Sequence, residues 1–126
     1  MILSSPVDGP ASQGYVITDG TTLNFAMPTI VLPAGLDNVP ESQAAGIPCA
    51  PEEISNLHFY DALDETSPRW LVNATEYGHG DYMDQGYLDL IINLHFCASK
   101  TDGTLDDFVL YRNFFSGQVV SFLKSK

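Results

Sequence analysis

A histidine between two glycines is the residue of this sequence best placed to do chemistry. His79 lies in Tyr77-Gly78-His79-Gly80-Asp81, just after the apolar run 69–74, and its small neighbours would let the imidazole ring protrude. An imidazole can accept and release a proton near neutral pH, especially when a carboxylate orients it. A lone histidine in a loop is more often structural, so the residues by themselves leave a catalytic role open.

Two aspartates are candidates for the partner of this histidine. Asp37 comes shortly after the apolar run 29–32, and Asp8 follows the run at the start of the chain. If these runs and 69–74 are parallel strands, the loops at their carboxyl ends meet at one edge of the sheet. Either carboxylate could then accept the imidazole N–H. Both could instead be turn residues whose side chains bond local backbone amides.

The other two histidines are weaker candidates. His58 and His95 lie in apparent helices beside aromatic or apolar residues, where packing or capping is the expected role. The acidic residues and the three histidines do not have the spacing of metal ligands. We therefore expect neither a metal nor a cofactor.

Both strands and helices are expected among the elements that must position these residues. The continuous β-branched and apolar run 29–32 predicts a strand covered on both faces, and strands are also expected at 1–3 and 69–74. Helices are expected at 56–63, 87–98 and 105–124. The last of these has an apolar stripe at helical spacing, made of Phe108, Tyr111, Phe115, Val119 and Phe122. This order predicts an α/β fold with about three parallel strands and packing helices.

Composition limits the classes of partner. The chain has 126 residues, enough for one domain, and its formal net charge of -11 would repel nucleic acid and anionic membrane surfaces. No apolar run approaches the length of about 18 residues that a membrane span needs. The two cysteines, Cys49 and Cys97, are most simply two buried thiols, and a disulfide between them is the alternative.

Six segments carry a resemblance to a known family. They are PVDG at 6–9, MPTIV at 27–31 with Gly35-Leu36, PCAP at 48–51, HFY at 58–60, YGHGDYMD at 77–84 and the apolar residues of 114–123. In this order they resemble segments of plant and algal chlorophyllases, which are α/β-hydrolases. The segment 77–84 is similar to the family's YGHMDMLDD, which contains the histidine of a Ser-His-Asp triad.

The resemblance implies roles for the candidate residues. His79 corresponds to the triad histidine, and Asp37 is the expected acid, because many α/β-hydrolases present their carboxylate after a strand followed by Gly-x-Asp. Asp8 is the alternative. Ser5 stands where the family's DPVDG segment has its first Asp, from which the family takes its acid. The family's serine motif, GHSRGG, precedes the PVDG segment, and this chain has no G-x-S-x-G pattern.

We therefore expect residues 1–126 to be the C-terminal portion of a single α/β-hydrolase domain, incomplete because the nucleophile-bearing N-terminal half is absent. The resemblance implies a serine carboxyl-ester hydrolase that cleaves the phytyl ester of chlorophyll to chlorophyllide and phytol, with the 126-residue chain inactive by itself. Alternatives are a lipid or polyester esterase of the same superfamily and a truncated, non-catalytic interaction module. The expected partners are an apolar ester and the missing half, and the resemblance suggests a plastid or another chlorophyll-containing compartment.

Overall fold

A small parallel sheet lies at the centre of the molecule. The computed structural model describes residues 1–6, 17, 22–23, 26–39, 48–50, 56–94, 97–100 and 102–125. The sheet has the order β1-β2-β3, formed by Ile2–Ser4, Thr29–Leu32 and Arg69–Leu71. Both pairs of strands are parallel, and Ile30 of β2 lies opposite Ile2 of β1 and Trp70 of β3. The carboxyl ends of all three strands therefore lie at one edge.

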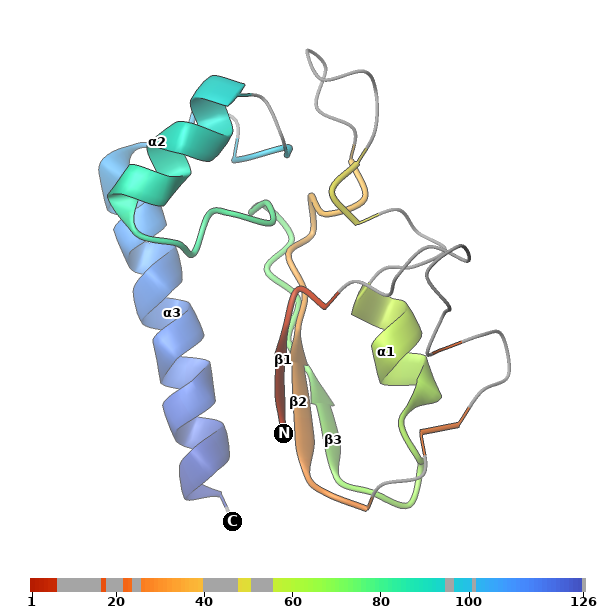
Figure 1. Cartoon of the computed structure of the whole chain (residues 1–126). Coiled ribbons are helices and arrows are strands. Elements are labelled where there is room, and N and C mark those ends of the chain that lie inside the picture. The colour runs from red at the N-terminus through yellow and green to blue at the C-terminus, as the bar shows by residue number, and fades with distance from the viewer. Residues whose placement is uncertain are drawn as a thin grey trace.

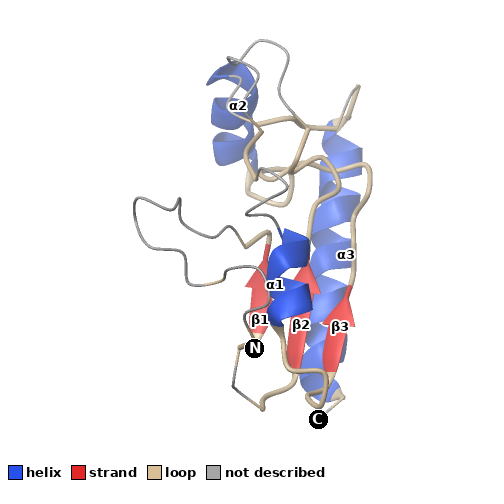
Figure 2. Cartoon of the chain, turned by 90° about the vertical axis from the view of Figure 1, so that its right-hand side faces the viewer, coloured by secondary structure: helices blue, strands red, loops and turns tan. Residues whose placement is uncertain are grey.

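Helices cover both faces of the sheet. In chain order they are α1 (Asn56–Ala62), α2 (Gln85–Leu94) and α3 (Leu105–Lys124). Figures 1 and 2 show α1 against one face, the long α3 against the other, and α2 beside one end of α3. The three-stranded parallel sheet with helices packed on it is compatible with the predicted α/β fold. Within the described part of the chain, no helix is long and apolar enough to cross a membrane.

The central strand β2 supplies the core, as the continuous apolar run predicts. All four of its residues are buried. Ile30 and Leu32 pack with Phe122 of α3, and Phe115 and Val119 border the same cluster. Because side chains alternate along a strand, Thr29 and Val31 face the opposite side of the sheet, which α1 covers.

The last helix has the bounds that its apolar stripe predicts. Its buried residues are Phe108, Tyr111 and Phe122. Thr104 caps its first turn, because the Thr104 side chain accepts a hydrogen bond from the backbone of Asp107 while the Asp107 carboxylate accepts one from the backbone of Thr104. This capping box fixes where α3 begins.

Other boundaries differ from those expected. Strand β3 ends at Leu71, although Ala74 still forms a bridge with Ala34. Helix α2 occupies 85–94 instead of 87–98. Helix α1 ends at Ala62 instead of residue 63, and its Leu57 is 47% exposed.

The two cysteines form a disulfide, which corrects the expectation of two buried thiols. Cys49 and Cys97 have Cα atoms 5.3 Å apart, a spacing typical of a disulfide, and their sulfur atoms are bonded. Because the two residues are 48 positions apart, nothing in their sequence spacing indicated that the fold would bring them together.

Candidate functional site

Asp37 lies in a tight turn directly after the central strand. Its backbone N–H donates to the carbonyl oxygen of Ala34 at 3.1 Å, and its carboxylate Oδ2 accepts a hydrogen bond from the Ala34 N–H at 3.3 Å. Ala50 N–H donates to the Asp37 carbonyl oxygen at 2.8 Å. The residue is only 2% exposed. These contacts hold the carboxylate in one orientation at the carboxyl edge of the sheet.

The loop after β3 runs beside this turn. Gly35 N–H donates to the Ala74 carbonyl oxygen at 2.9 Å, and Leu36 N–H donates to that of Tyr77 at 3.0 Å. A Cβ atom at Gly35 would overlap the backbone of Thr75, so only glycine permits this approach. Hydrogen bonds between neighbouring segments thus continue from β2 and β3 into the two loops. They bring the loop that contains His79 close to the turn that contains Asp37.

The two loops bring His79 and Asp37 together. His79 Nδ1 lies 3.2 Å from Asp37 Oδ1, and the side chains are 25% and 3% exposed, respectively. With the proton on Nδ1, the imidazole donates to Asp37 and leaves Nε2 as a hydrogen-bond acceptor. This is the tautomer that a general base requires, and a distance at the long end of the hydrogen-bond range is common in unliganded sites.

A buried tyrosine of α3 lies near these loops. Tyr111 of α3 stacks on Tyr77 with ring centroids 4.1 Å apart. Burial raises the pKa of the Tyr111 phenol far above its ordinary value, and the nearby carboxylates of Asp37 and Asp81 raise it further. Tyr111 is therefore a neutral aromatic support and does not itself exchange a proton near neutral pH.

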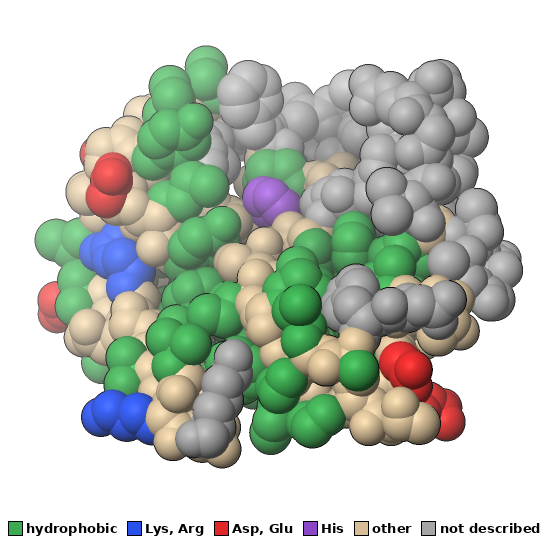
Figure 3. Space-filling model, turned by 60° about the horizontal axis from the view of Figure 1, so that its bottom comes forward, with side chains coloured by type: hydrophobic (Ala, Val, Ile, Leu, Met, Phe, Trp, Pro, Cys, Tyr) green, Lys and Arg blue, Asp and Glu red, His purple; other side chains and the backbone are tan. Residues whose placement is uncertain are grey.

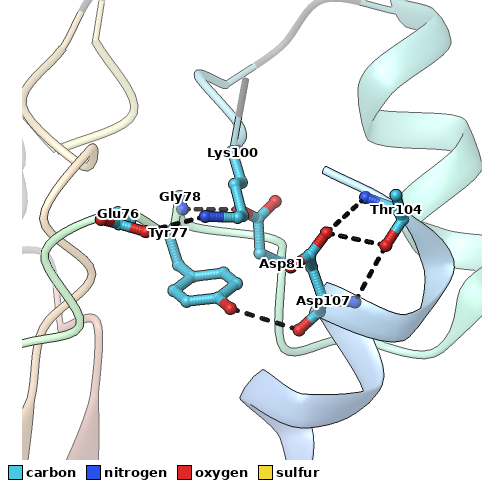
Figure 4. Close-up of polar contacts among 7 residues, drawn as sticks. All are labelled: Glu76, Tyr77, Gly78, Asp81, Lys100, Thr104 and Asp107. Carbon is cyan, nitrogen blue, oxygen red and sulfur yellow. Dashed lines mark hydrogen bonds and ion pairs between the residues drawn. The ribbon is translucent and has the colours of Figure 1, made fainter. Parts of the chain in front are cut away.

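An ion pair flanks the histidine loop. Lys100 Nζ lies 2.8 Å from Glu76 Oε2 and 5.0 Å from the centroid of the Tyr77 ring. Figure 4 shows Lys100 reaching Glu76 across the loop. The hydrogen bond from Lys100 lowers the pKa of Glu76, and the same bond raises the pKa of Lys100. The pair connects the loop before His79 with the segment that follows α2.

The remaining sequence candidates lie elsewhere. Asp8 and His95 are outside the described residues. His58 Nε2 lies 2.9 Å from the carbonyl oxygen of Ile17, a structural contact of the expected kind. Asp84, the last residue of the segment 77–84, is not a candidate for the acid; its Oδ1 accepts a hydrogen bond from Tyr87 N–H at 3.2 Å, at the start of α2. No group of His, Cys, Asp and Glu suited to a metal ion occurs among the described residues.

Ser5, at the position where the resemblance placed an acid, is buried after β1. It is 5% exposed and has a positive φ of 38°, which is unusual for a residue other than glycine. Among the described residues its hydroxyl has no hydrogen-bond partner. Its N–H donates to the Leu32 carbonyl oxygen at 3.0 Å, so Ser5 lies at the same edge of the sheet as the loop that carries Asp37.

An apolar crevice lies beside the histidine loop. The crevice, of about 320 Å³, opens between residues 73–77 and the α3 residues Leu110, Tyr111 and Phe114. Figure 3 shows hydrophobic side chains gathered across one face of the molecule, with acidic and basic groups toward its margins. The exposed large hydrophobic residues include Trp70, Leu71, Leu110 and Leu123.

Sequence reasoning missed the contacts that join the histidine loop to the segment after α2. Ser99 and Lys100 both bond to Asp81, and neither belongs to a recognisable motif. The glycines around His79 were the available indication of close packing. A Cβ atom at Gly78 would overlap the carbonyl oxygen of Ala98.

Two comparisons with known proteins bear on the identity of the chain. A family model described as Chlorophyllase matches residues 4–126. No curated protein matches the chain significantly.

Proposed function

The chain belongs to the chlorophyllase family, and we propose that it contributes the histidine and the acid of a serine carboxyl-ester hydrolase, His79 and Asp37. The observation that carries this proposal is the contact between His79 Nδ1 and Asp37 Oδ1, which joins the loops after two neighbouring parallel strands. In α/β-hydrolases the acid precedes the histidine along the chain, and these residues have that order.

The proposed chemistry follows from the tautomer. His79 Nε2 accepts the proton of a serine hydroxyl as the serine oxygen attacks the ester carbonyl, and it then donates that proton to the leaving alcohol. Asp37 remains ionised, orients the ring through Nδ1 and stabilises the imidazolium. Water repeats the sequence on the acyl-serine and releases the acid. Asp37 is favoured over Asp8 because its carboxylate contacts the ring.

These 126 residues contain no G-x-S-x-G motif that would supply the serine. We propose that residues 1–126 form the C-terminal portion of one α/β-hydrolase domain and that the serine-bearing half extends the sheet beyond β1. In support, β1 is an edge strand among the described elements, and Ile2 on it is 37% exposed. An unpaired strand edge is a template for a further strand.

The proposed substrate is an uncharged ester with a long alkyl chain, the phytyl ester of chlorophyll, which hydrolysis converts to chlorophyllide and phytol. Family membership supports this class of substrate. The apolar crevice beside the histidine loop is consistent with it, because the transfer of an apolar chain from water to an apolar surface is favourable.

A chimera tests the proposal. In this chimera, residues 1–126 replace the corresponding part of an active chlorophyllase. Two activities would be measured: the release of chlorophyllide from chlorophyll, and the hydrolysis of a long-chain aliphatic ester. We expect chlorophyll to be cleaved, and kcat to fall about 10⁴-fold when Asp37→Asn or His79→Ala disables the acid–base pair. The matched control is His58→Gln, at a histidine outside this site whose Nε2 contacts the carbonyl oxygen of Ile17.

Two outcomes would contradict the proposal. A folded chimera whose His79→Ala variant matches the His58→Gln control in kcat would exclude His79 as the base. Hydrolysis of the aliphatic ester without hydrolysis of chlorophyll would refute the proposed substrate and favour a lipid or polyester esterase.

A further inference from the structure

Asp81, two residues after His79, is a buried carboxylate with three hydrogen-bond donors. It is 1% exposed. Its Oδ2 accepts hydrogen bonds from the N–H groups of Gly78 at 2.7 Å and Lys100 at 2.9 Å, and its Oδ1 accepts one from the Ser99 hydroxyl. Figure 4 shows the Asp81 carboxylate between the histidine loop and the segment that carries Lys100. The donors come from both segments, so the carboxylate joins them.

The same residue also closes the turn that contains His79. Asp81 N–H donates to the Gly78 carbonyl oxygen at 3.1 Å, while Gly78 N–H donates back to the Asp81 side chain. His79 and Gly80 are therefore the two central residues of a turn that is fixed at both ends. One residue earlier, Tyr77 is bound to the Asp37 loop through the N–H of Leu36.

The burial of this carboxylate distinguishes it from an exposed turn residue. Burying a carboxylate costs free energy unless hydrogen bonds satisfy it. Here one of the donors is Gly78 N–H, so the carboxylate connects Gly78 and Asp81, the two ends of the turn that contains His79. By contrast, Asp84 in the same loop is exposed and accepts one hydrogen bond at the start of α2. The two aspartates thus differ in what they hold: Asp81 holds the turn around His79, and Asp84 holds the helix.

We propose that Asp81 is a positioning residue for His79. By fixing the 78–81 turn against Ser99 and Lys100, its carboxylate keeps His79 Nδ1 within reach of Asp37 Oδ1, and so selects the Nδ1–H tautomer. This inference rests on the proposed function, in which His79 and Asp37 form the acid–base pair.

The test uses the 126-residue chain and nitrogen NMR of the His79 ring at neutral pH, which reports the tautomer directly. In Asp81→Ala we expect a measurable fraction of the Nε2–H tautomer of His79. We also expect hydrogen exchange of the Gly78 amide to be at least about tenfold faster, because its hydrogen bond to a charged acceptor is lost. Asp81→Asn should restore much of the wild-type signature, since its amide oxygen can accept from both N–H groups while its NH₂ donates to Ser99. Asp84→Ala is the matched control and should leave the tautomer unchanged.

The outcomes separate this inference from the proposed function. If wild-type His79 is not in the Nδ1–H tautomer, the acid–base pair itself is refuted. If wild type has that tautomer and Asp81→Ala keeps it despite lower thermal stability, Asp81 is only structural and the inference is overturned. Should Asp81→Ala fail to fold, Ser99→Ala decides the question. It removes one donor, so a folded Ser99→Ala protein with unchanged Gly78 exchange and His79 tautomer would equally overturn the inference.

Discussion

The Cys49–Cys97 disulfide joins the segment that packs on Asp37 to the segment that packs beside His79. On one side, Ala50 follows Cys49 and donates its N–H to the Asp37 carbonyl oxygen at 2.8 Å. On the other side, Ala98 follows Cys97, and its carbonyl oxygen lies so close to Gly78 that a Cβ atom there would overlap it. One covalent bond therefore connects the supports of both members of the candidate pair.

Removing this bond should destabilise the chain. For two cysteines 48 positions apart, the loop-entropy model gives a loss of about 4 kcal/mol in the free energy of unfolding. Urea denaturation of the Cys49→Ser, Cys97→Ser double variant would measure the loss, and reduced wild type is the control and should match the variant. Identical denaturation midpoints for oxidised and reduced wild type would contradict the prediction.

Gly78 and Gly117 should respond in opposite ways to alanine. At Gly78 the added methyl group meets the backbone of Ala98, and such overpacking costs about 1–3 kcal/mol. At Gly117 in α3, no atom of the described residues outside the helix's own backbone lies within 4 Å of the added carbon, and alanine is favoured over glycine in a helix by about 1 kcal/mol. Thermal unfolding of both variants would test this. A Gly78→Ala variant as stable as wild type would show that the loop does not pack on Ala98 as described.

Much of the fold was predictable because its patterns are local. The β-branched run 29–32 forms β2, and the stripe from Phe108 to Phe122 forms a helix with the bounds expected. The approach of Asp37 to His79 also followed from a general rule, that parallel strands end at one edge of a sheet. Their catalytic role stays a prediction.

What could not be predicted depends on contacts between distant segments. The disulfide, and the hydrogen bonds from Ser99 and Lys100 to Asp81, have no local pattern. The same contacts involve residues near the predicted end of α2. The apolar residues favoured a helix to residue 98, but α2 ends at Leu94. Beyond it, Cys97 is bonded to Cys49 and Ser99 donates a hydrogen bond to Asp81.

The Glu76–Lys100 pair predicts a dependence on pH. The pKa of Glu76 is lowered from its ordinary value of 4.5, so its contribution to stability is present above that pH and is lost as the pH falls through the folded-state pKa. The pKa of Lys100 is raised from 10.5, so its contribution is present below that pH and is lost as the pH rises through the raised value. Both effects should disappear together in Lys100→Gln.

An NMR titration of the Glu76 carboxyl carbon would measure this change. In Lys100→Gln we expect the pKa of Glu76 to return toward its ordinary value, because the hydrogen bond from Lys100 is its largest cause of lowering. Lys124→Gln removes the same charge at the end of α3 and is the control. An unchanged Glu76 titration in Lys100→Gln would show that the two side chains do not pair in solution.

The chain by itself should not hydrolyse esters. In the proposed mechanism His79 activates a serine of a G-x-S-x-G motif, and these 126 residues contain no such motif. We expect the purified chain to turn over a chromogenic short-chain ester no faster than its His79→Ala variant. Turnover well above that control would require another nucleophile within these 126 residues.

The most direct test of the account is the protonation of the two ring nitrogens of His79 in wild type and in Asp37→Ala, measured by NMR correlation of each nitrogen with the ring protons. At neutral pH we expect the uncharged wild-type ring to carry its proton on Nδ1, next to Asp37 Oδ1 at 3.2 Å, and to leave Nε2 unprotonated. In Asp37→Ala, the loss of the acceptor should release the ring to a mixture of tautomers. A wild-type ring protonated on Nε2, or a tautomer unaffected by Asp37→Ala, would contradict the assignment of Asp37 and His79 as an acid–base pair.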